Sequence, residues 1–244
     1  MSREYLKDSG RKTFDFSKTD QNRGVPMPPI QKPVPKGAKV IQLPEFPKTI
    51  GKTQLRKVIA GRKSRRSFLK GPISLEELSF LLWTTQGVRD GENPARIYRN
   101  VPSAGNRHAF ETYLAVFNVD GLSKGIYRYL PLEHAIVLQC NPRGLESKVS
   151  KGCFGQKFAG SSAATFIWTT IPYRMEWRYG DTSHKVIALD AGHVCQNLYL
   201  GCESIGCGTC AIAAYDQEAM DELLGLDGRD EFVIYIAPVG KVED

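Results

Sequence analysis

The sequence lacks any long hydrophobic run. No apolar stretch approaches the roughly 20 residues that a membrane-spanning helix requires, so we expect no membrane partner. The first residues are charged and no apolar segment follows them, which indicates no secretory signal and predicts a cytoplasmic protein. Neither G-x-G-x-x-G nor G-x-x-x-x-G-K-[ST] occurs, which argues against a Rossmann or P-loop nucleotide site.

The chain has six cysteines, and in a large chain of 244 residues without a signal peptide we expect reduced thiols rather than a disulfide framework. Four of them crowd into residues 195–210, and the Cys202-x4-Cys207-x2-Cys210 spacing matches three ligands of a plant-type iron–sulfur loop. No cysteine follows Cys210, and Cys195 lies upstream in a helical pattern. The alternative is that these are small buried residues at a helix end and in a strand, which we favour, so no metal is predicted.

Positive charge is unevenly distributed. Residues 1–70 carry 18 Lys/Arg and 5 Asp/Glu, a net of +13, whereas residues 71–244 carry 15 and 21, a net of −6. The basic excess would suit an anionic cofactor, nucleic acid or simple solubility. Aromatic residues are not interleaved with the basic ones, so we expect no nucleic-acid partner.

Prolines divide the chain into two parts. Between residues 26 and 47 they recur among polar residues, which disfavours helix and favours extended chain. We therefore predict a proline-rich N-terminal arm over residues 1–49, with Ile41-Gln42-Leu43 as its apolar anchor, and one domain over residues 50–244. The prolines are Pro26, Pro28, Pro29, Pro33, Pro35, Pro44 and Pro47.

Hydrophobic periodicity predicts a mixture of helices and strands in the domain. Helices are expected over 53–61, 74–86, weakly over 144–158, over 184–200 and over 216–225. Strands are expected over 111–119, 126–129, 135–138, 164–170, 207–213 and 232–237. The early strands form a meander, so the expected fold class is an α+β sandwich, and residues 88–100 are expected to be polar and irregular.

Two short stretches carry the candidate chemistry. Residues 62–68 pack four cations and two hydroxyls into seven positions, and residues 101–106 form a Pro/Ser/Gly/Asn turn whose small side chains allow close backbone approach. Together they suit a phosphorylated, planar cofactor. Taken alone, the first could be a solvated basic face and the second an ordinary turn.

Four segments in the same order resemble motifs of the nitroreductase superfamily of flavin mononucleotide (FMN) enzymes. They are Arg62-Lys63-Ser64-Arg65-Arg66-Ser67-Phe68, Pro102-Ser103-Ala104-Gly105-Asn106, Gly206-Cys207-Gly208-Thr209-Cys210-Ala211-Ile212-Ala213-Ala214-Tyr215-Asp216 and Pro238-Val239-Gly240-Lys241. The resemblance implies a central, mostly antiparallel sheet flanked by helices, in a homodimer that shares its domains. Residues 125–129 with Glu133-His134, and the proline-rich arm, resemble the SagB-like dehydrogenase branch.

The resemblance also implies site roles. Arg62 and Ser64 would bind the FMN phosphate and ribityl end beside Lys63, and Arg66 would lie near the flavin N1/O2 edge. The second subunit would contribute the turn at the interface. The backbone of Ala213 and Ala214 would donate to N5 and O4, Lys241 would be a phosphate ligand, and no side chain would be catalytic. The full set of cofactor-binding candidates is Arg62, Lys63, Ser64, Arg66, Pro102, Ser103, Ala104, Asn106, Ile212, Ala213, Ala214 and Lys241.

The implied activity is reduction of an electron-poor small molecule by NADH or NADPH, in a ping-pong cycle of hydride transfer through flavin N5. Two alternatives stay open: a SagB-like flavin dehydrogenase that oxidises a substrate such as an azoline-containing peptide, and a non-catalytic flavin-holding protein. The family's Gly-Gly pair is Ala213-Ala214 here, so a positive φ at these positions would cause strain. His108, directly after the turn, is expected to be a structural surface histidine rather than a substrate contact.

Overall fold

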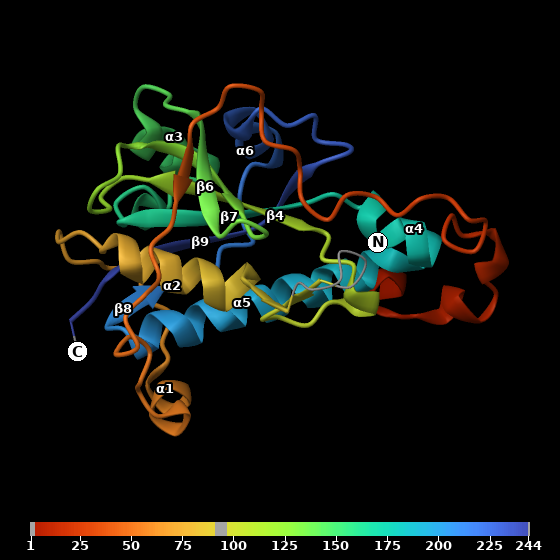
Figure 1. Cartoon of the computed structure of the whole chain (residues 1–244), viewed down its shortest axis with the longest axis horizontal. Coiled ribbons are helices and arrows are strands. Elements are labelled where there is room, and N and C mark those ends of the chain that lie inside the picture. The colour runs from red at the N-terminus through yellow and green to blue at the C-terminus, as the bar shows by residue number, and fades with distance from the viewer. Residues whose placement is uncertain (1–2, 91–96, 244) are drawn as a thin grey trace.

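A seven-stranded antiparallel sheet forms the middle of the molecule (Figure 1). The computed structural model describes residues 3–90 and 97–243. In sheet order the strands are β1 (Val40–Gln42), β6 (Ala135–Cys140), β5 (Gly125–Leu130), β4 (Phe110–Val116), β7 (Ala164–Thr170), β9 (Phe232–Lys241) and β8 (Cys207–Thr209). A separate hairpin joins β2 (Val88–Asp90) to β3 (Tyr98–Arg99).

Helices cover both faces of the sheet (Figure 1). One face carries α2 (Leu75–Gln86) and α5 (His184–Ser204), and the other carries α3 (Leu145–Gly152) and α6 (Gln217–Leu224). The short helix α1 (Leu55–Gly61) projects beyond α5, while α4 (Tyr173–Tyr179) lies past the end of the sheet beside the N-terminal residues (Figure 1). This three-layer arrangement confirms the predicted α+β fold class.

The side chains of β4 alternate between the two faces of the sheet, and each face is covered by a layer of helices. Tyr113 and Ala115 pack into the core beneath α3 and α6, whereas Leu114 and Val116 pack into the core beneath α2 and α5. All seven residues of the strand are buried, because successive side chains of a strand point to opposite faces and both faces are covered. The centre of the sheet is therefore rigid support for whatever lies at its edges.

The N-terminal arm lies against its own chain. It contains three short 3-10 helices, η1 (Arg3–Leu6), η2 (Ser9–Lys12) and η3 (Phe16–Lys18), which precede the prolines. The indole of Trp177 donates to the carbonyl of Val25 at 2.9 Å, and β1 then pairs with β6 and forms the edge of the sheet. Ile41 packs against the core and Leu43 is 4% exposed, so the expected anchor is confirmed.

A buried charge network fastens the middle of the arm to the sheet. The carboxylate of Glu111, on β4, accepts from Arg128 at 3.2 Å, from Arg174 at 2.5 Å and from the backbone N–H of Lys32 at 2.9 Å. Arg128 also donates to the carbonyls of Lys32 and Pro33. Because Glu111, Arg128 and Arg174 are each at most 3% exposed, these contacts are shielded from water.

Several element boundaries differ from expectation. The helix expected over 144–158 ends at Gly152, because Phe154 and Gly155 take positive φ values that a helix does not allow. Strand β8 ends at Thr209 rather than 213, and β9 continues to Lys241 rather than 237. Helix α4 and the β2–β3 pair were not predicted; the central part of the expected irregular stretch, residues 91–96, lies outside the described residues. None of the helices in the described chain is long and apolar enough to cross a membrane.

Candidate functional site

The basic segment, residues 62–68, follows α1 and runs along the β8 end of the sheet. Arg62 ends the helix by taking an extended ψ of 121°. The backbone N–H of Arg65 then donates to the carbonyl of Thr209 at 2.9 Å, and that of Leu69 donates to the carbonyl of Lys241 at 2.8 Å. These bonds fix the backbone of the segment against two strands, so its side chains project from a defined position.

Tyr199, near the C-terminal end of α5, contacts three residues, Arg62, Ser64 and Ala211. Its ring lies 5.3 Å from the guanidinium carbon of Arg62, its hydroxyl is 3.0 Å from Ser64 Oγ, and that hydroxyl accepts from the N–H of Ala211 at 2.8 Å. Sequence reasoning missed this residue. A half-buried tyrosine on a long helix gives no signal of which distant segment it faces.

The backbone after β8 presents two open donors. Ile212 is buried and exchanges two backbone hydrogen bonds with Ile236, at 2.7 and 3.2 Å. Ala213 and Ala214 follow and are exposed, and within the described residues their N–H groups have no acceptor. Neither alanine has a positive φ, so the alanine pair is accommodated without the expected strain.

The remaining candidate cations differ in their exposure and in whether they already have an ion-pair partner. Lys63 is exposed, and the exposed Arg66 lies 6.0 Å over the ring of Phe158. Lys241 instead forms an ion pair with Glu77, the residue whose other carboxylate oxygen completes the capping box of α2. Burial acts to lower the pKa of Lys241, but the Glu77 contact and nearby charges outweigh it and raise that pKa. Its charge is already balanced, which weakens its predicted role as a phosphate ligand.

The second stretch forms a tight turn on a different part of α5. Gly105 and Asn106 both have φ of 58°, the left-handed conformation that glycine and asparagine tolerate. The N–H of Ala104 donates to the carboxylate of Asp190 at 3.1 Å, and Ser103 Oγ accepts from the N–H of His108 at 2.9 Å. Pro102 is exposed at the start of the turn.

His108 is buried rather than at the surface, which corrects the expectation. It is 4% exposed, and its Nε2 lies 2.8 Å from Asn106 Oδ1. Burial lowers the pKa of His108 to about 2, and the nearby Arg99, Arg107 and Arg174 contribute to the shift. The imidazole is therefore neutral and supports the turn from beneath.

The two stretches do not meet within one chain. Tyr199 holds the first and Asp190 holds the second, and these residues are nine positions apart on α5. Nine residues make about 2.5 turns and roughly 14 Å of rise, which places the two contacts on opposite faces of the helix. The two stretches are therefore held at different places on α5 within one chain.

The comparisons with known proteins identify the family of this chain. The profile of the Nitroreductase family matches residues 59–241, which is most of the chain. The chain belongs to the nitroreductase family. This nitroreductase is also 31% identical, over 201 residues, to a protein of Methanocaldococcus jannaschii assigned as a nitroreductase, covering 82% of this chain and 96% of that one.

Solved structures share the fold of this nitroreductase. A Ralstonia eutropha protein assigned as a nitroreductase is 27% identical with a TM-score of 0.68, covering 90% of this chain and 99% of that chain. An Anabaena variabilis protein with the same assignment is 25% identical with a TM-score of 0.72 and covers 85% of this chain. This nitroreductase spans only 42% of the Anabaena chain.

A more distant structure matches the whole length of this nitroreductase. A chain of the Escherichia coli microcin synthetase complex McbBCD, solved with a truncated pro-MccB17 bound, covers 100% of this chain and 95% of its own. Identity is 18% and the TM-score is 0.63, so the likeness is one of fold. Together the comparisons make this nitroreductase a flavin-dependent oxidoreductase enzyme.

The cysteines of this nitroreductase have a structural explanation. Cys195, Cys202 and Cys207 belong to the core between the sheet and α2/α5, and Cys210 is 3% exposed. Burial raises the pKa of Cys195 and of Cys207 to about 12, so these thiols are protonated and inert at neutral pH. Within residues 3–90 and 97–243, no group of three or more His, Cys, Asp or Glu residues is arranged to hold a metal.

Proposed function

We propose that this nitroreductase binds FMN between the basic segment and the 211–214 backbone, and reduces an electron-poor small molecule with NADH or NADPH. The single observation that carries the proposal is the Arg62–Ser64–Tyr199–Ala211 cluster. It holds a cation, a hydroxyl and the segment after β8 that bears two open N–H donors at one edge of the sheet. The family assignment supports the same cofactor class.

The residues present fit the chemistry of FMN. A cavity of about 290 Å³ follows the basic segment from Ser64 to Leu69, and the buried Nε of Arg65 at its wall has no partner in the described chain. Guanidinium groups suit phosphate oxygens because they offer several donors in one plane. The cavity and the unpaired donors are thus consistent with the phosphate end of the cofactor.

Each of the candidate site residues would hold one part of the cofactor. Arg62 and Ser64 would hold the phosphate and ribityl end, and Arg66 would place positive charge near the flavin N1/O2 edge. The exposed N–H groups of Ala213 and Ala214 would donate to N5 and O4. Bound FMN would supply reversible hydride acceptance, so no side-chain acid or base is required.

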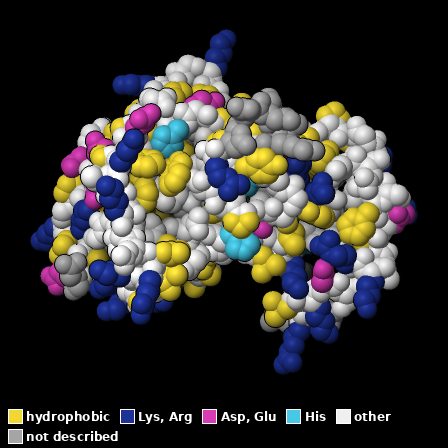
Figure 2. Space-filling view, turned by 60° about the horizontal axis from the view of Figure 1, so that its bottom comes forward, with side chains coloured by type: hydrophobic (Ala, Val, Ile, Leu, Met, Phe, Trp, Pro, Cys, Tyr) yellow, Lys and Arg dark blue, Asp and Glu magenta, His cyan; other side chains and the backbone are white. Residues whose placement is uncertain are grey.

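A homodimer would complete the site. Helix α5 exposes a strip that includes Ala188, Gly192 and Leu189, the last 54% exposed, and α1 exposes Leu55 and Ile59 at 64% and 59%. Figure 2, which brings this side forward, shows hydrophobic and basic side chains interspersed over it. In the proposed dimer, Pro102, Ser103, Ala104 and Asn106 of one protomer reach the flavin held by Arg62 of the other.

A second candidate is oxidation of a substrate in the manner of SagB-like dehydrogenases. It is favoured by one observation: the microcin synthetase chain is matched over the whole length, including the N-terminal arm that the family profile does not reach. In that case the electrons would flow from a substrate such as an azoline-containing peptide to the flavin, with another acceptor regenerating it.

Anaerobic mixing of the FMN-loaded protein with NADH or NADPH tests the direction. We expect loss of the yellow flavin absorbance with at least one nicotinamide, and recovery when a quinone or nitroarene is added. A flavin that neither nicotinamide reduces, but that an azoline substrate does, would replace the first function with the second. A bound flavin inert to all of them would indicate a flavin-holding protein.

Tyr199→Phe tests the cluster at its centre. The ring that faces Arg62 is kept, but Ser64 Oγ loses a partner and the N–H of Ala211 loses its acceptor. We expect the dissociation constant for FMN to rise roughly 2- to 10-fold, the usual range for one hydrogen bond. Fluorescence titration of apoprotein measures it, with Tyr173→Phe, whose hydroxyl binds Asp20 on the arm, as a matched control that leaves affinity unchanged.

A further inference from the structure

Two arginines, Arg107 and Arg178, pack against the turn at Gly105. The Nε of Arg107 donates to the carbonyl of Gly105 at 3.0 Å. A Cβ built on Gly105 would lie 2.7 Å from the Nε of Arg178 and 2.5 Å from the hydroxyl of Tyr179, so the Arg178 side chain is packed directly on the turn. Only glycine leaves room for this approach, and Gly105 also has positive φ.

Aromatic rings hold both guanidinium groups in place. Arg107 lies 5.2 Å over the ring of Trp177, and Arg178 lies 5.5 Å over the ring of Tyr179. The hydrogen-bond acceptors of the pair are neutral, namely the carbonyl of Gly105 and, for Arg178, the amide oxygen of Gln21 at 3.1 Å. Stacking orients a cation but leaves its charge uncancelled.

Neither arginine of the pair has an ion-pair partner among the described residues. No carboxylate lies within ion-pair distance of Arg107 or Arg178 among the described residues, although Arg107 is only 9% exposed. Burial lowers the pKa of Arg107, and the proximity of Arg178 lowers it further. Holding two uncompensated cations together costs stability, so an anionic group that enters beside them would be stabilised.

We propose that Arg107 and Arg178 form an anion-binding patch beside the flavin, and that the substrate of this nitroreductase carries a carboxylate or another oxyanion. The inference rests on the proposed function, because the turn that carries Gly105 is the one assigned to the partner's flavin. Arg178 is half-buried and is the more accessible of the two, whereas Arg107 is buried.

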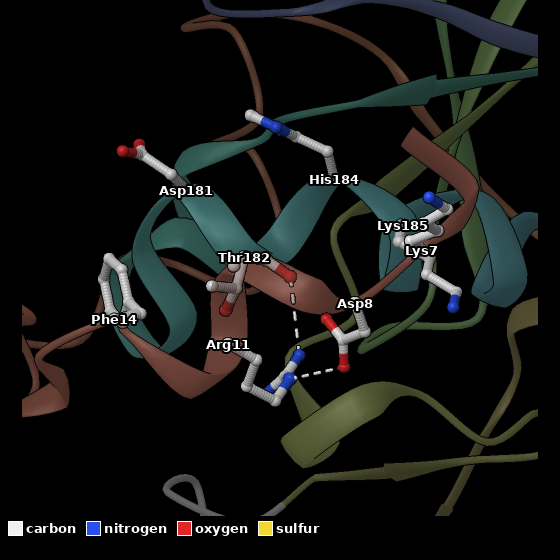
Figure 3. A pocket seen from close by; sticks show the side chains of 9 residues that line it. Lys7, Asp8, Arg11, Phe14, Asp181, Thr182, His184 and Lys185 are labelled. Carbon is white, nitrogen blue, oxygen red and sulfur yellow. Dashed lines mark hydrogen bonds and ion pairs between the residues drawn. The ribbon is translucent and has the colours of Figure 1, made fainter. Parts of the chain in front are cut away.

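A third arginine near Tyr179, Arg11, differs from this pair in having a carboxylate partner. Arg11 lies 5.6 Å from the ring that Arg178 also covers, and it lines a cavity of about 320 Å³ between the arm and the start of α5. In Figure 3 Arg11 points toward Asp8 and the carbonyl of Thr182, and Asp181 points away from it. Arg11 is thus paired with Asp8, whereas Arg107 and Arg178 do not line this cavity and have no carboxylate at ion-pair distance among the described residues.

The test compares two acceptors that differ in one charge. For FMN-loaded protein and a fixed nicotinamide, kcat/KM is measured with 4-nitrobenzoate and with 4-nitrobenzamide. We expect the wild type to favour the benzoate and Arg178→Gln to lower the benzoate-to-benzamide ratio by roughly 10- to 100-fold, the loss expected for a hydrogen bond to a charged group. Arg229→Gln, at an exposed arginine whose nearest carboxylate is Asp230 at 3.9 Å, is the control and should keep the wild-type ratio.

Equilibrium binding separates this proposal from the proposed function. Calorimetric titration with each nitro compound should show tighter binding of the benzoate and loss of that preference in Arg178→Gln, even if no turnover occurs. If kcat/KM for the nicotinamide falls with both acceptors instead, the anion is a phosphate of the dinucleotide. An unchanged ratio, together with equal binding of the two nitro compounds to the wild type, would overturn the anion patch.

Discussion

Glu111→Gln is expected to lower the free energy of unfolding by about 3–5 kcal/mol, because it leaves buried cations without their counter-charge. The glutamine keeps the shape of the side chain but removes the negative charge that Arg128 and Arg174 share. The N–H of Lys32 also depends on this carboxylate. At roughly 2–4 °C per kcal/mol for a chain of this size, the melting temperature should fall by roughly 6–20 °C.

The matched control is Glu146→Gln. Its ion pair with Lys124 is shorter, at 2.6 Å, but the two side chains are 41% and 61% exposed. Solvent screening limits such a pair to about 0–1 kcal/mol. Denaturant titration of both variants in the FMN-free form measures the difference. Equal, small losses in the two variants would show that the buried network does not stabilise the fold.

The same variant should also loosen the arm. Glu111 and Arg128 together hold the backbone at Lys32 and Pro33, so weakening them frees the segment between Val25 and β1. We expect faster tryptic cleavage after Lys36 and Lys39, which lie in this segment, in Glu111→Gln than in Glu146→Gln, under conditions where both remain folded.

Arg62→Gln is expected to weaken FMN binding roughly 10- to 100-fold, which is the usual effect of losing a charge-assisted hydrogen bond. Arg62 lies over the Tyr199 ring beside Ser64, so its guanidinium is held in place before the cofactor arrives. The neutral glutamine keeps a donor but removes the positive charge that would face the phosphate. Fluorescence titration of the apoprotein with FMN gives the dissociation constant.

Arg56→Gln is the control for that measurement. Arg56 lies on α1, a few residues before the basic segment, and is exposed. Its removal lowers the net charge by the same amount, so general attraction of an anion is changed equally. An equal loss of affinity in the two variants would mean that the basic segment attracts FMN only through net charge, and the assigned role of Arg62 would be wrong.

Local sequence signals predicted the elements that depend on local chemistry. The capping box at Ser74 and Glu77 gave the start of α2, and the apolar run 164–170 gave β7 with its observed bounds. Asp216 and Gly225 likewise bounded α6, where Asp216 accepts from Ala219 and Gly225 takes the left-handed conformation. In each case the deciding interaction spans only a few residues.

Contacts between distant segments could not be predicted in this way. Helix α4 owes its place to the arm, through the Trp177–Val25 bond across 152 positions. The pairing of Lys241, a predicted phosphate ligand, with Glu77 spans 164 positions. Tyr199 meets Ser64 across 135 positions. Such partners are selected by the packed fold, and no nearby residue in the sequence indicates them.

The short strand β1 shields the sheet from its neighbours. Val40, Ile41 and Gln42 occupy the pairing positions along Val137, Ile136 and Ala135, so the outermost long strand does not end the sheet. A protein shortened to begin after residue 45 would leave the backbone donors and acceptors of β6 open to a strand from another molecule. Such a truncation is a route to strand-swapped oligomers or fibrils, even though the core beneath it would be untouched.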